Sequence, residues 1–338
     1  MRVEEFDYHL PPELIAQEPA PRREGSRLLV LNRAGGQLRD ATFEALPDLL
    51  RPGDLLVANE SRVLPARLHG RLETGGMVEL LLVRARDDRV WEVMAKPGRK
   101  LRLGTTVRLE EGAQAVVEAV DGDRPRVRID GVTDLPAWLA RHGRLPTPPY
   151  IKQYPDDPER YQTVYARTPG SIAAPTAGLH FSERLLGRLR DRGIETVFVT
   201  LHVGPATFTP VRAETVESIR LEGEQGVIRG EVAERISSAE SEGRRIVAVG
   251  TTTTRLLEGV AARHGMVVAS EGPVDLFIRP PFHFRVVDAL ITNFHLPRST
   301  LLMLVSAFAG RDRILRAYAH AVEQRYRFYS FGDAMLIQ

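Results

Sequence analysis

The sequence predicts an α/β protein: a layered body of sheet and helices that carries an inserted all-β barrel. Two observations predict this class. Strand-like and helix-like segments alternate from residue 182 onward, whereas residues 63–148 contain short stretches of period two separated by glycine-bearing turns. At 338 residues the chain is long enough for two domains. We therefore expect a discontinuous α/β domain over residues 1–62 and 149–338, and a β-barrel domain over residues 63–148.

The first sixty residues fit the α/β body. Pro11 and Pro12 open a short helix, and two segments have the apolar character of strands, residues 26–31 and 54–58. In the barrel, the expected strands span residues 66–72, 78–84, 89–95, 106–109, 113–120 and 126–130. A short helix over residues 134–140 ends at Gly143, and the proline-rich segment 145–150 marks the boundary.

In the second half, Ser182 is a candidate N-cap for a helix that stops at Gly193. Ser299 or Thr300 is expected to cap a later apolar helix. The remaining elements expected are helices over residues 230–242, 255–263 and 311–325, and strands over residues 195–203, 245–249 and 274–278.

Composition excludes several classes of protein. The chain has no cysteine, which excludes disulfides, thiolate nucleophiles, cysteine-ligated zinc and iron–sulfur clusters. Its nine histidines lack metal-binding spacing, so we expect no metal site. No apolar run approaches the about 20 residues of a membrane helix, and no signal core is visible, so we expect a cytoplasmic protein. A net charge of only +2 does not suggest a strongly basic nucleic-acid-binding face, although a local basic patch can still bind RNA.

Residues 171–181 form the first candidate site. Its small residues, Gly178 among them, let a ligand approach the backbone, and the helix that follows offers free N–H groups and a positive dipole end. Thr176 and Gly178 would then contact a carboxylate or phosphate beside His180. The alternative is a tight turn that packs His180 under the helix.

Residues 286–300 form the second candidate site. Asn293 and His295 lie two apart, so in an extended segment they face the same side, with Phe294 pointing into the core. An amide and an imidazole on one face can orient a ribose and move a proton. The alternative is a polar cap on a buried helix.

Two strand ends add weaker candidates. His202 ends one expected strand, and Gly250, Thr251 and Thr252 lie between another strand and a helix, where adenosyl ligands bind in α/β sheets. The alternatives are a structural histidine and an ordinary helix cap, because neither the dinucleotide-binding nor the P-loop glycine motif is present.

The segment that opens the barrel is also polar. Its arginines, Arg62 and Arg67, could hold an anion, and Asn59 and Glu60 could bind hydroxyls. The alternative is an ion-pair hinge between the two domains, and the residues alone favour that interpretation.

Taken together, the segments point to one family. The chain closely resembles the S-adenosylmethionine:tRNA ribosyltransferase-isomerases of the queuosine pathway, almost end to end. Ala-Pro-Thr-Ala-Gly-Leu-His-Phe at 174–181 and Thr-Asn-Phe-His-Leu-Pro at 292–297 carry the resemblance. Further matching segments are residues 6–11, 15–19, 26–31, 62–68, 150–152, 161–165, 201–204, 250–252, 298–304, 325–328 and 332–335.

The resemblance implies a fold and a reaction. The family fold is an α/β domain with an inserted β-barrel, which agrees with the pattern of the residues. The reaction transfers the ribosyl part of S-adenosylmethionine to 7-aminomethyl-7-deazaguanine at the tRNA wobble position. It gives epoxyqueuosine and releases adenine and methionine. No metal or cofactor beyond S-adenosylmethionine as co-substrate is implied, and we expect a monomer that acts on tRNA.

This chemistry requires a base, because the sulfonium acidifies the adjacent ribose carbon. We expect His180 or His295 to be that base and Asn293 to hold ribose hydroxyls, with Asp288 or Asp333 orienting an imidazole or the amine. The residues expected to contact S-adenosylmethionine are Thr176, Gly178, His202, Gly250, Thr251 and Thr252. Those expected to contact tRNA are Arg62, Arg67, Lys96, Arg99, Lys100 and Lys152.

Three segments depart from the family pattern. They are residues 205–208, which begin Pro205-Ala206, residues 219–224, which contain no histidine, and residues 279–284. We expect them to change affinity if they contact tRNA or the methionine group. Two rival functions are a methyltransferase that uses S-adenosylmethionine and a non-catalytic tRNA-binding protein.

Overall fold

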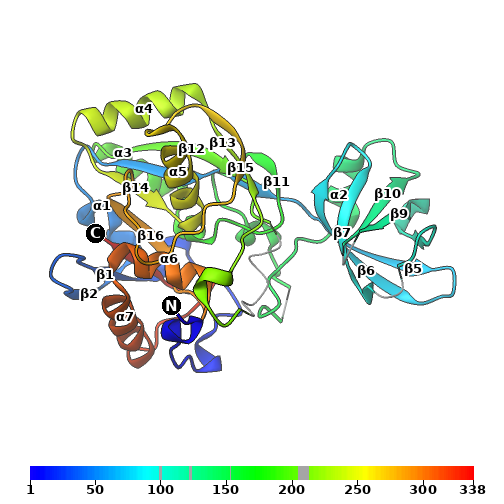
Figure 1. Ribbon diagram of the computed structural model, residues 1–338, viewed down its shortest axis with the longest axis horizontal. Coiled ribbons are helices and arrows are strands. Elements are labelled where there is room, and N and C mark those ends of the chain that lie inside the picture. The colour runs from blue at the N-terminus through cyan, green and yellow to red at the C-terminus, as the bar shows by residue number, and fades with distance from the viewer. Residues whose placement is uncertain (99–100, 122–123, 153, 205–212) are drawn as a thin grey trace. The chain divides into compact units, whose positions relative to one another are not determined.

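The computed structural model describes residues 1–98, 101–121, 124–152, 154–204 and 213–338. They form two compact units (Figure 1). The first comprises Met1–Arg62, Pro149–Thr168 and Ala174–Gln338, and the second comprises Val63–Pro148 and Pro169–Ala173. None of the described helices is long and apolar enough to cross a lipid bilayer.

The second unit contains a closed antiparallel barrel. Its strand order is β10-β7-β6-β5-β8-β9, and the pairing of β9 with β10 closes it. The strands are β5 (Arg67–Leu72), β6 (Met77–Ala85), β7 (Val90–Lys96), β8 (Thr106–Arg108), β9 (Gln114–Asp121) and β10 (Arg124–Asp130). Alternate residues such as Leu80, Leu82 and Val127 fill the interior, as period two requires. The helix α2 (Leu135–His142) begins at Asp134, whose side chain caps it, and stops at Gly143.

The first unit is built on a nine-stranded mixed sheet of order β15-β13-β12-β3-β14-β16-β17-β1-β2. The strands are β1 (Arg27–Leu31), β2 (Leu38–Thr42), β3 (Leu55–Asn59), β12 (Glu195–Leu201), β13 (Glu224–Ile228), β14 (Ile246–Val249), β15 (Ser270–Val274), β16 (Ala289–Asn293) and β17 (Ala334–Ile337). Strands β12, β3, β14 and β16 run parallel as neighbours. Their carboxyl ends therefore meet at one edge of the sheet. Separately, β4 (Ser61–Val63) pairs with β11 (Thr168–Ser171).

Helices cover both faces of this sheet (Figure 1). The apolar cluster on one face includes residues of α1 (Leu46–Leu49) and α3 (Glu183–Asp191). The cluster on the other face includes residues of four helices, α4 (Gly230–Ser241), α5 (Thr251–His264), α6 (Thr300–Ala309) and α7 (Arg311–Glu323). The predicted caps are present, since Ser182 Oγ accepts from Leu185 N and Ser299 Oγ accepts from Leu302 N. The predicted fold class, an α/β body with an inserted barrel, is confirmed.

Two element predictions need correction. The strand expected at residues 274–278 is β15, which ends at Val274. Arg255 donates to the carbonyl oxygens of Val274 and Leu276, so these oxygens bond to a side chain instead of a neighbouring strand. Pro273 is tolerated because β15 is an edge strand. The helix expected from Arg255 begins earlier, at Thr251. The hydroxyls of Thr253 and Thr254 do not cap it, since they donate to the carbonyl oxygens of Val249 and Gly250, four residues earlier.

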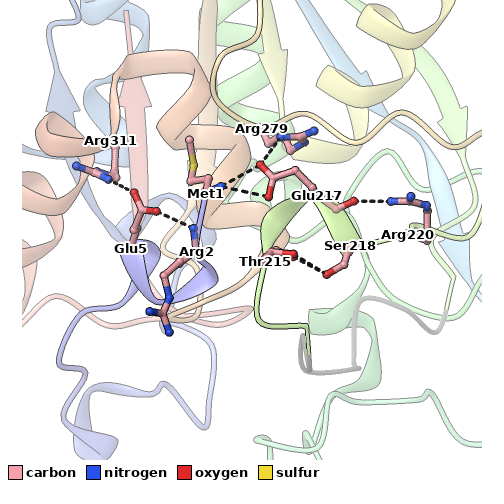
Figure 2. A network of polar contacts seen from close by, with 9 residues as sticks. All are labelled: Met1, Arg2, Glu5, Thr215, Glu217, Ser218, Arg220, Arg279 and Arg311. Carbon is pink, nitrogen blue, oxygen red and sulfur yellow. Dashed lines mark hydrogen bonds and ion pairs between the residues drawn. The ribbon is translucent and has the colours of Figure 1, made fainter.

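A polar network ties the N-terminus to the middle of the chain (Figure 2). The amino group of Met1 lies 3.1 Å from a carboxylate oxygen of Glu217, which also pairs with Arg279. Arg311 at the start of α7 pairs with Glu5 at 2.6 Å. These pairs are largely exposed, so the network orders the N-terminus without contributing much to stability.

Candidate active site at the carboxyl edge of the parallel strands

The predicted site segments converge at the carboxyl edge of the parallel strands. Asn59, His202, Gly250 and Asn293 stand at or directly after the ends of β3, β12, β14 and β16. The short helix η8 (Thr176–His180) packs against β16. Ligands of open α/β sheets bind at this edge, so the arrangement identifies a candidate active site.

His180 is held on both sides of its ring. Its Nδ1 lies 2.7 Å from Ser26 Oγ, and its Nε2 lies 3.2 Å from the amide nitrogen of Asn293. Because an amide N–H only donates, Nε2 is the acceptor and Nδ1–H donates to the serine oxygen. The ring also stacks on Phe43 with centroids 5.0 Å apart.

His180 is neutral. Burial lowers its pKa from 6.5 to about 3, and the positive charges of Arg327 and Arg23 contribute to the lowering of that pKa. At neutral pH the ring therefore keeps its Nδ1 proton, which it donates to Ser26 Oγ, and its Nε2 lone pair can take a proton. The ring is thus in the form of a general base and not of a general acid, while a pKa of about 3 makes it a weaker base than an exposed histidine.

Asn293 links His180 to the C-terminal loop. Its amide nitrogen also donates to the carbonyl of Tyr329 at 3.0 Å, and Tyr329 adopts a φ of 74°. The amide oxygen of Asn293 is buried and has no hydrogen-bond partner among the described residues. A buried polar atom without a partner is unfavourable, so this oxygen is available to a donor such as a ligand hydroxyl.

His295 lies in a different arrangement. Its Nε2 is 2.8 Å from Thr292 Oγ1, and its backbone N–H donates to the hydroxyl of Tyr318. Burial lowers its pKa to about 3. Thr292 and Asn293 are successive residues of a strand, so their side chains leave opposite faces. The prediction that Asn293 and His295 face the same side is therefore wrong. Strand β16 ends at Asn293, and His295 folds back onto Thr292. Phe294 is fully buried in the core, as expected.

Gly178 and Thr176 lie in η8. A Cβ on Gly178 would lie 2.2 Å from the hydroxyl oxygen of Tyr165 and 2.7 Å from Thr163 Cγ2. The space that we expected a ligand to occupy is thus filled by a side chain, and packing explains the glycine. The hydroxyls of Tyr165 and Thr163 are themselves buried without described partners. Thr176, by contrast, is half-buried.

The start of α5 faces η8. Gly250 has a φ of 90°, and a Cβ there would lie 3.7 Å from that of Ala177. None of the described side chains caps this helix, so the first-turn N–H groups around Thr251 and Thr252 keep their positive partial charge. Thr252 Oγ1 also lies 3.5 Å from the amide nitrogen of Asn59. These groups can hold an anionic or polar part of a ligand.

At β12, Asn59 bonds to both the N–H and the carbonyl of Leu201, which fixes the strand end. His202 follows it half-buried, and burial lowers its pKa. The Nδ1 of His202 is buried without a described partner. Glu60 is buried and pairs with Arg229 at 2.6 Å, so it serves as an ion-pair partner.

Asp288 does not belong to this site. It precedes β16, and its carboxylate accepts from Ile246 N at the start of β14. Strand geometry separates it from Asn293 by about 16 Å, so it cannot orient either imidazole. Asp333 lies closer: it accepts from the backbone N–H groups of Arg27 and Arg327. It therefore fixes the segment that begins with Ser26 and does not touch His180 directly.

The basic residues predicted to contact tRNA fall into both units. Arg62 pairs with Glu159 at 2.6 Å, and Arg67 pairs with Glu79 at 2.9 Å, so both are already neutralised within their own unit. Lys96 and Lys152 are exposed. Arg99 and Lys100 lie outside the described residues, as do residues 205–208, which include Pro205 and Ala206.

Two cavities lie elsewhere in the first unit. One of about 150 Å³ separates α5 from β13 and β15. The other, of about 450 Å³, lies at the start of α7 beside the network of Figure 2. Neither is lined by a predicted catalytic residue. Among the described residues, no cluster of three or more histidine, aspartate or glutamate side chains could hold a metal ion.

Sequence reasoning missed two partners of the His180 ring and one of Asn293. Ser26 and Phe43, which contact the ring, come from segments more than 130 residues away in sequence, and the Tyr329 carbonyl accepts from Asn293. One signal was present: Ser26 and Arg27 are polar residues at the head of a strand that is otherwise apolar.

Comparisons with known proteins identify the family of the chain. The family model described as "Queuosine biosynthesis protein" matches residues 3–337. A Carboxydothermus hydrogenoformans protein named S-adenosylmethionine:tRNA ribosyltransferase-isomerase is 52% identical over 340 residues, with all of both chains covered. A Thermus thermophilus protein of the same name is 55% identical over 347 residues, with 99% of each chain covered.

A solved structure is also similar. The S-adenosylmethionine tRNA ribosyltransferase of Thermotoga maritima is 38% identical, with a TM-score of 0.58, and the match covers 99% of this chain and 100% of that one. The family model and these relatives span essentially the whole sequence. The chain belongs to the queuosine biosynthesis protein family.

Proposed function

We propose that this chain transfers and isomerises the ribosyl part of S-adenosylmethionine onto 7-aminomethyl-7-deazaguanine at the tRNA wobble position. The products are epoxyqueuosine in the tRNA, adenine and methionine. The observation that carries the proposal is the neutral His180 between Ser26 and Asn293 at the carboxyl edge, in a chain with relatives of this name over its full length.

We assign the base to His180. The reaction needs a neutral base to remove a proton from the ribose carbon beside the sulfonium, and burial keeps this imidazole neutral. Its Nε2 accepts only the long 3.2 Å bond from Asn293. When substrate binds, Asn293 can release that nitrogen and keep its 3.0 Å bond to Tyr329. The free amide oxygen of Asn293 then accepts from a ribose hydroxyl.

The ligand would lie along the carboxyl edge. We propose that the uncapped start of α5, with Gly250, Thr251 and Thr252, contacts S-adenosylmethionine, and that Thr176 and His202 border the same ligand. Gly178 contributes by letting Tyr165 pack. His295 supports the site by fixing the turn after β16.

The two compact units would divide the work. We propose that residues 1–62 and 149–338 form the catalytic domain and that residues 63–148 form an inserted barrel domain that helps to bind tRNA. Lys96 in the barrel and Lys152 in the catalytic domain are exposed cations suited to phosphates. The enzyme would act as a cytoplasmic monomer with no cofactor beyond S-adenosylmethionine.

The test is product analysis. The purified chain is incubated with S-adenosylmethionine and tRNA that carries the aminomethyl precursor, and adenine, methionine and the modified nucleoside are measured. We expect equal amounts of adenine and an epoxide-bearing nucleoside. Methyl transfer without adenine release would identify a methyltransferase instead, and tight tRNA binding without turnover would identify a binding protein.

A further inference from the structure

Three arginines beside the candidate active site have no carboxylate partner among the described residues. Arg23 donates to the carbonyls of Leu179 and Glu159 at 3.2 and 2.9 Å. Arg160 donates to the carbonyls of Ala20 and Pro21, and Arg327 donates to the carbonyl of Glu18. Within the described part of the chain, none of the three forms an ion pair. Their guanidinium groups are thus positioned by main-chain oxygens. The charges of Asp157 and Glu159 act on Arg23, and that of Asp333 on Arg327, without a direct ion pair.

Neighbouring arginines, in contrast, do pair with carboxylates. Arg22 pairs with Glu44 at 3.4 Å, although it is adjacent to Arg23 in sequence. Arg184 pairs with Glu24 and Glu44. The carboxylate of Glu159 pairs with Arg62, which leaves only its carbonyl to Arg23. The carboxylates of Glu24, Glu44 and Glu159 therefore form their direct ion pairs with other arginines.

These three arginines lie close to one another and to His180. Arg23 donates to the residue directly before His180, and Arg23 and Arg327 both lower the pKa of His180 by their charge. Arg160 in turn lowers the pKa of Arg23, and each of these two donates to the segment that carries the other. Arg23 and Arg327 thus lie close enough to the buried imidazole for their charges to act on it, and Arg160 lies beside Arg23.

Charge decides which ligand these arginines suit. At neutral pH, S-adenosylmethionine carries one carboxylate, one ammonium and one sulfonium, so its net charge is positive and three arginines would repel it. A nucleic-acid backbone carries one negative charge per nucleotide, and a guanidinium binds a phosphate with two parallel N–H bonds. Each of these arginines has donors left for such a contact, because a guanidinium offers five.

We propose that Arg23, Arg160 and Arg327 form a clamp for the tRNA backbone phosphates that flank the nucleotide being modified. The inference rests on the proposed function, and it adds a binding surface in the catalytic domain beside the lysines already considered. Phosphates held here would bring the wobble nucleotide to His180.

Salt dependence of tRNA binding tests the clamp. For single-stranded RNA, the slope of log K against log salt concentration becomes shallower by about 0.7 for each phosphate that the protein no longer neutralises. We expect Arg23→Gln, Arg160→Gln and Arg327→Gln each to reduce the slope by that amount, with KM for S-adenosylmethionine unchanged. Arg22→Gln is the matched control and should leave the slope at its wild-type value.

Lysine variants separate charge from packing. Arg23→Lys and Arg327→Lys keep the charge but lose the geometry of the carbonyl bonds, so a phosphate role predicts a slope close to that of the wild type. If the lysine and glutamine variants lose tRNA affinity equally with unchanged slopes, the arginines are structural and the clamp is wrong. A rise in KM for S-adenosylmethionine with an unchanged salt slope for tRNA would mean that these arginines bind the carboxylate of the methionine group instead of phosphates. If the wild-type protein releases adenine and the arginine variants have unaltered salt slopes, only the clamp is refuted. If the wild-type protein releases no adenine, the proposed function is refuted.

Discussion

The two edges of the parallel strands in the first unit are built in different ways. At the amino edge, charges meet partners: Asp54 holds Arg245 through two bonds of 2.9 and 2.6 Å, and Asp288 accepts from Ile246 N. At the carboxyl edge, polar atoms of Asn293 and His202 are buried without described partners. The polar groups named at the amino edge thus have partners within the fold, whereas those named at the carboxyl edge are available to a ligand.

This difference separates stability from function. Buried polar atoms without partners and uncompensated arginines are unfavourable for folding, and they persist at sites that bind something. We therefore expect changes at the amino edge to affect the free energy of unfolding, and changes at the carboxyl edge to affect turnover.

The largest effect on stability is expected at the amino edge. Asp54 is 2% exposed, and its removal would leave Arg245, which is 18% exposed, without its ion-pair partner. Asp54→Ala should lower the free energy of unfolding by about 3 to 5 kcal/mol, while adenine release per folded molecule stays at the wild-type rate. Urea unfolding and an activity assay at low temperature measure both. An unfolding midpoint of Asp54→Ala equal to that of the wild type would contradict the claim that the amino edge contributes to stability.

The buried histidines at the carboxyl edge should make the stability of the chain fall in acid. His180 and His295 stay neutral in the folded chain down to a pKa of about 3, whereas each binds a proton below pH 6.5 when unfolded. The unfolded state therefore binds more protons, and stability falls as the pH drops from 6.5 toward 3. Between pH 7 and pH 5 the loss should be about 2 kcal/mol for each histidine. Urea unfolding of His180→Gln should show a shallower pH dependence than the wild type by that amount. Parallel curves would contradict the neutral state of His180.

Gly178 tests packing near the site. A Cβ there would meet Tyr165 and Thr163, so Gly178→Ala should destabilise the chain by about 1 to 3 kcal/mol through overpacking. Gly187→Ala is the control without overpacking, because a Cβ at Gly187 meets nothing within 4 Å, and alanine inside α3 should stabilise the chain by up to about 1 kcal/mol. Thermal unfolding of the two variants compares them. Equal stability would mean that the space over Gly178 is open to a ligand after all.

The smallest effect is expected at Asp288. Asp288→Asn keeps an oxygen that accepts from Ile246 N, so stability should change by less than about 1 kcal/mol. Adenine release should be unchanged, since Asp288 is at the amino edge. A loss of turnover beyond tenfold in this variant would restore it as a candidate that orients an imidazole.

The sequence predicted the fold class well because periodicity is local. The six barrel strands and the helix caps at Ser182 and Ser299 follow from patterns within a few residues. The site was predicted in its members but not in its contacts. That Asn293 joins His180 while His295 joins Thr292 depends on where β16 ends and on segments brought together from distant parts of the chain. Asp288 was misplaced for the same reason, since proximity in sequence did not reveal which end of the strand it occupies.

The central claim is that His180 at the carboxyl edge removes the proton that starts the reaction. The most direct measurement is the single-turnover rate of adenine release, with tRNA bound, for the wild type, His180→Ala and the exposed control His264→Ala. The account predicts a loss of about 10² to 10⁴ in His180→Ala and none in the control. Adenine release by His180→Ala at a rate near that of the wild type would contradict it.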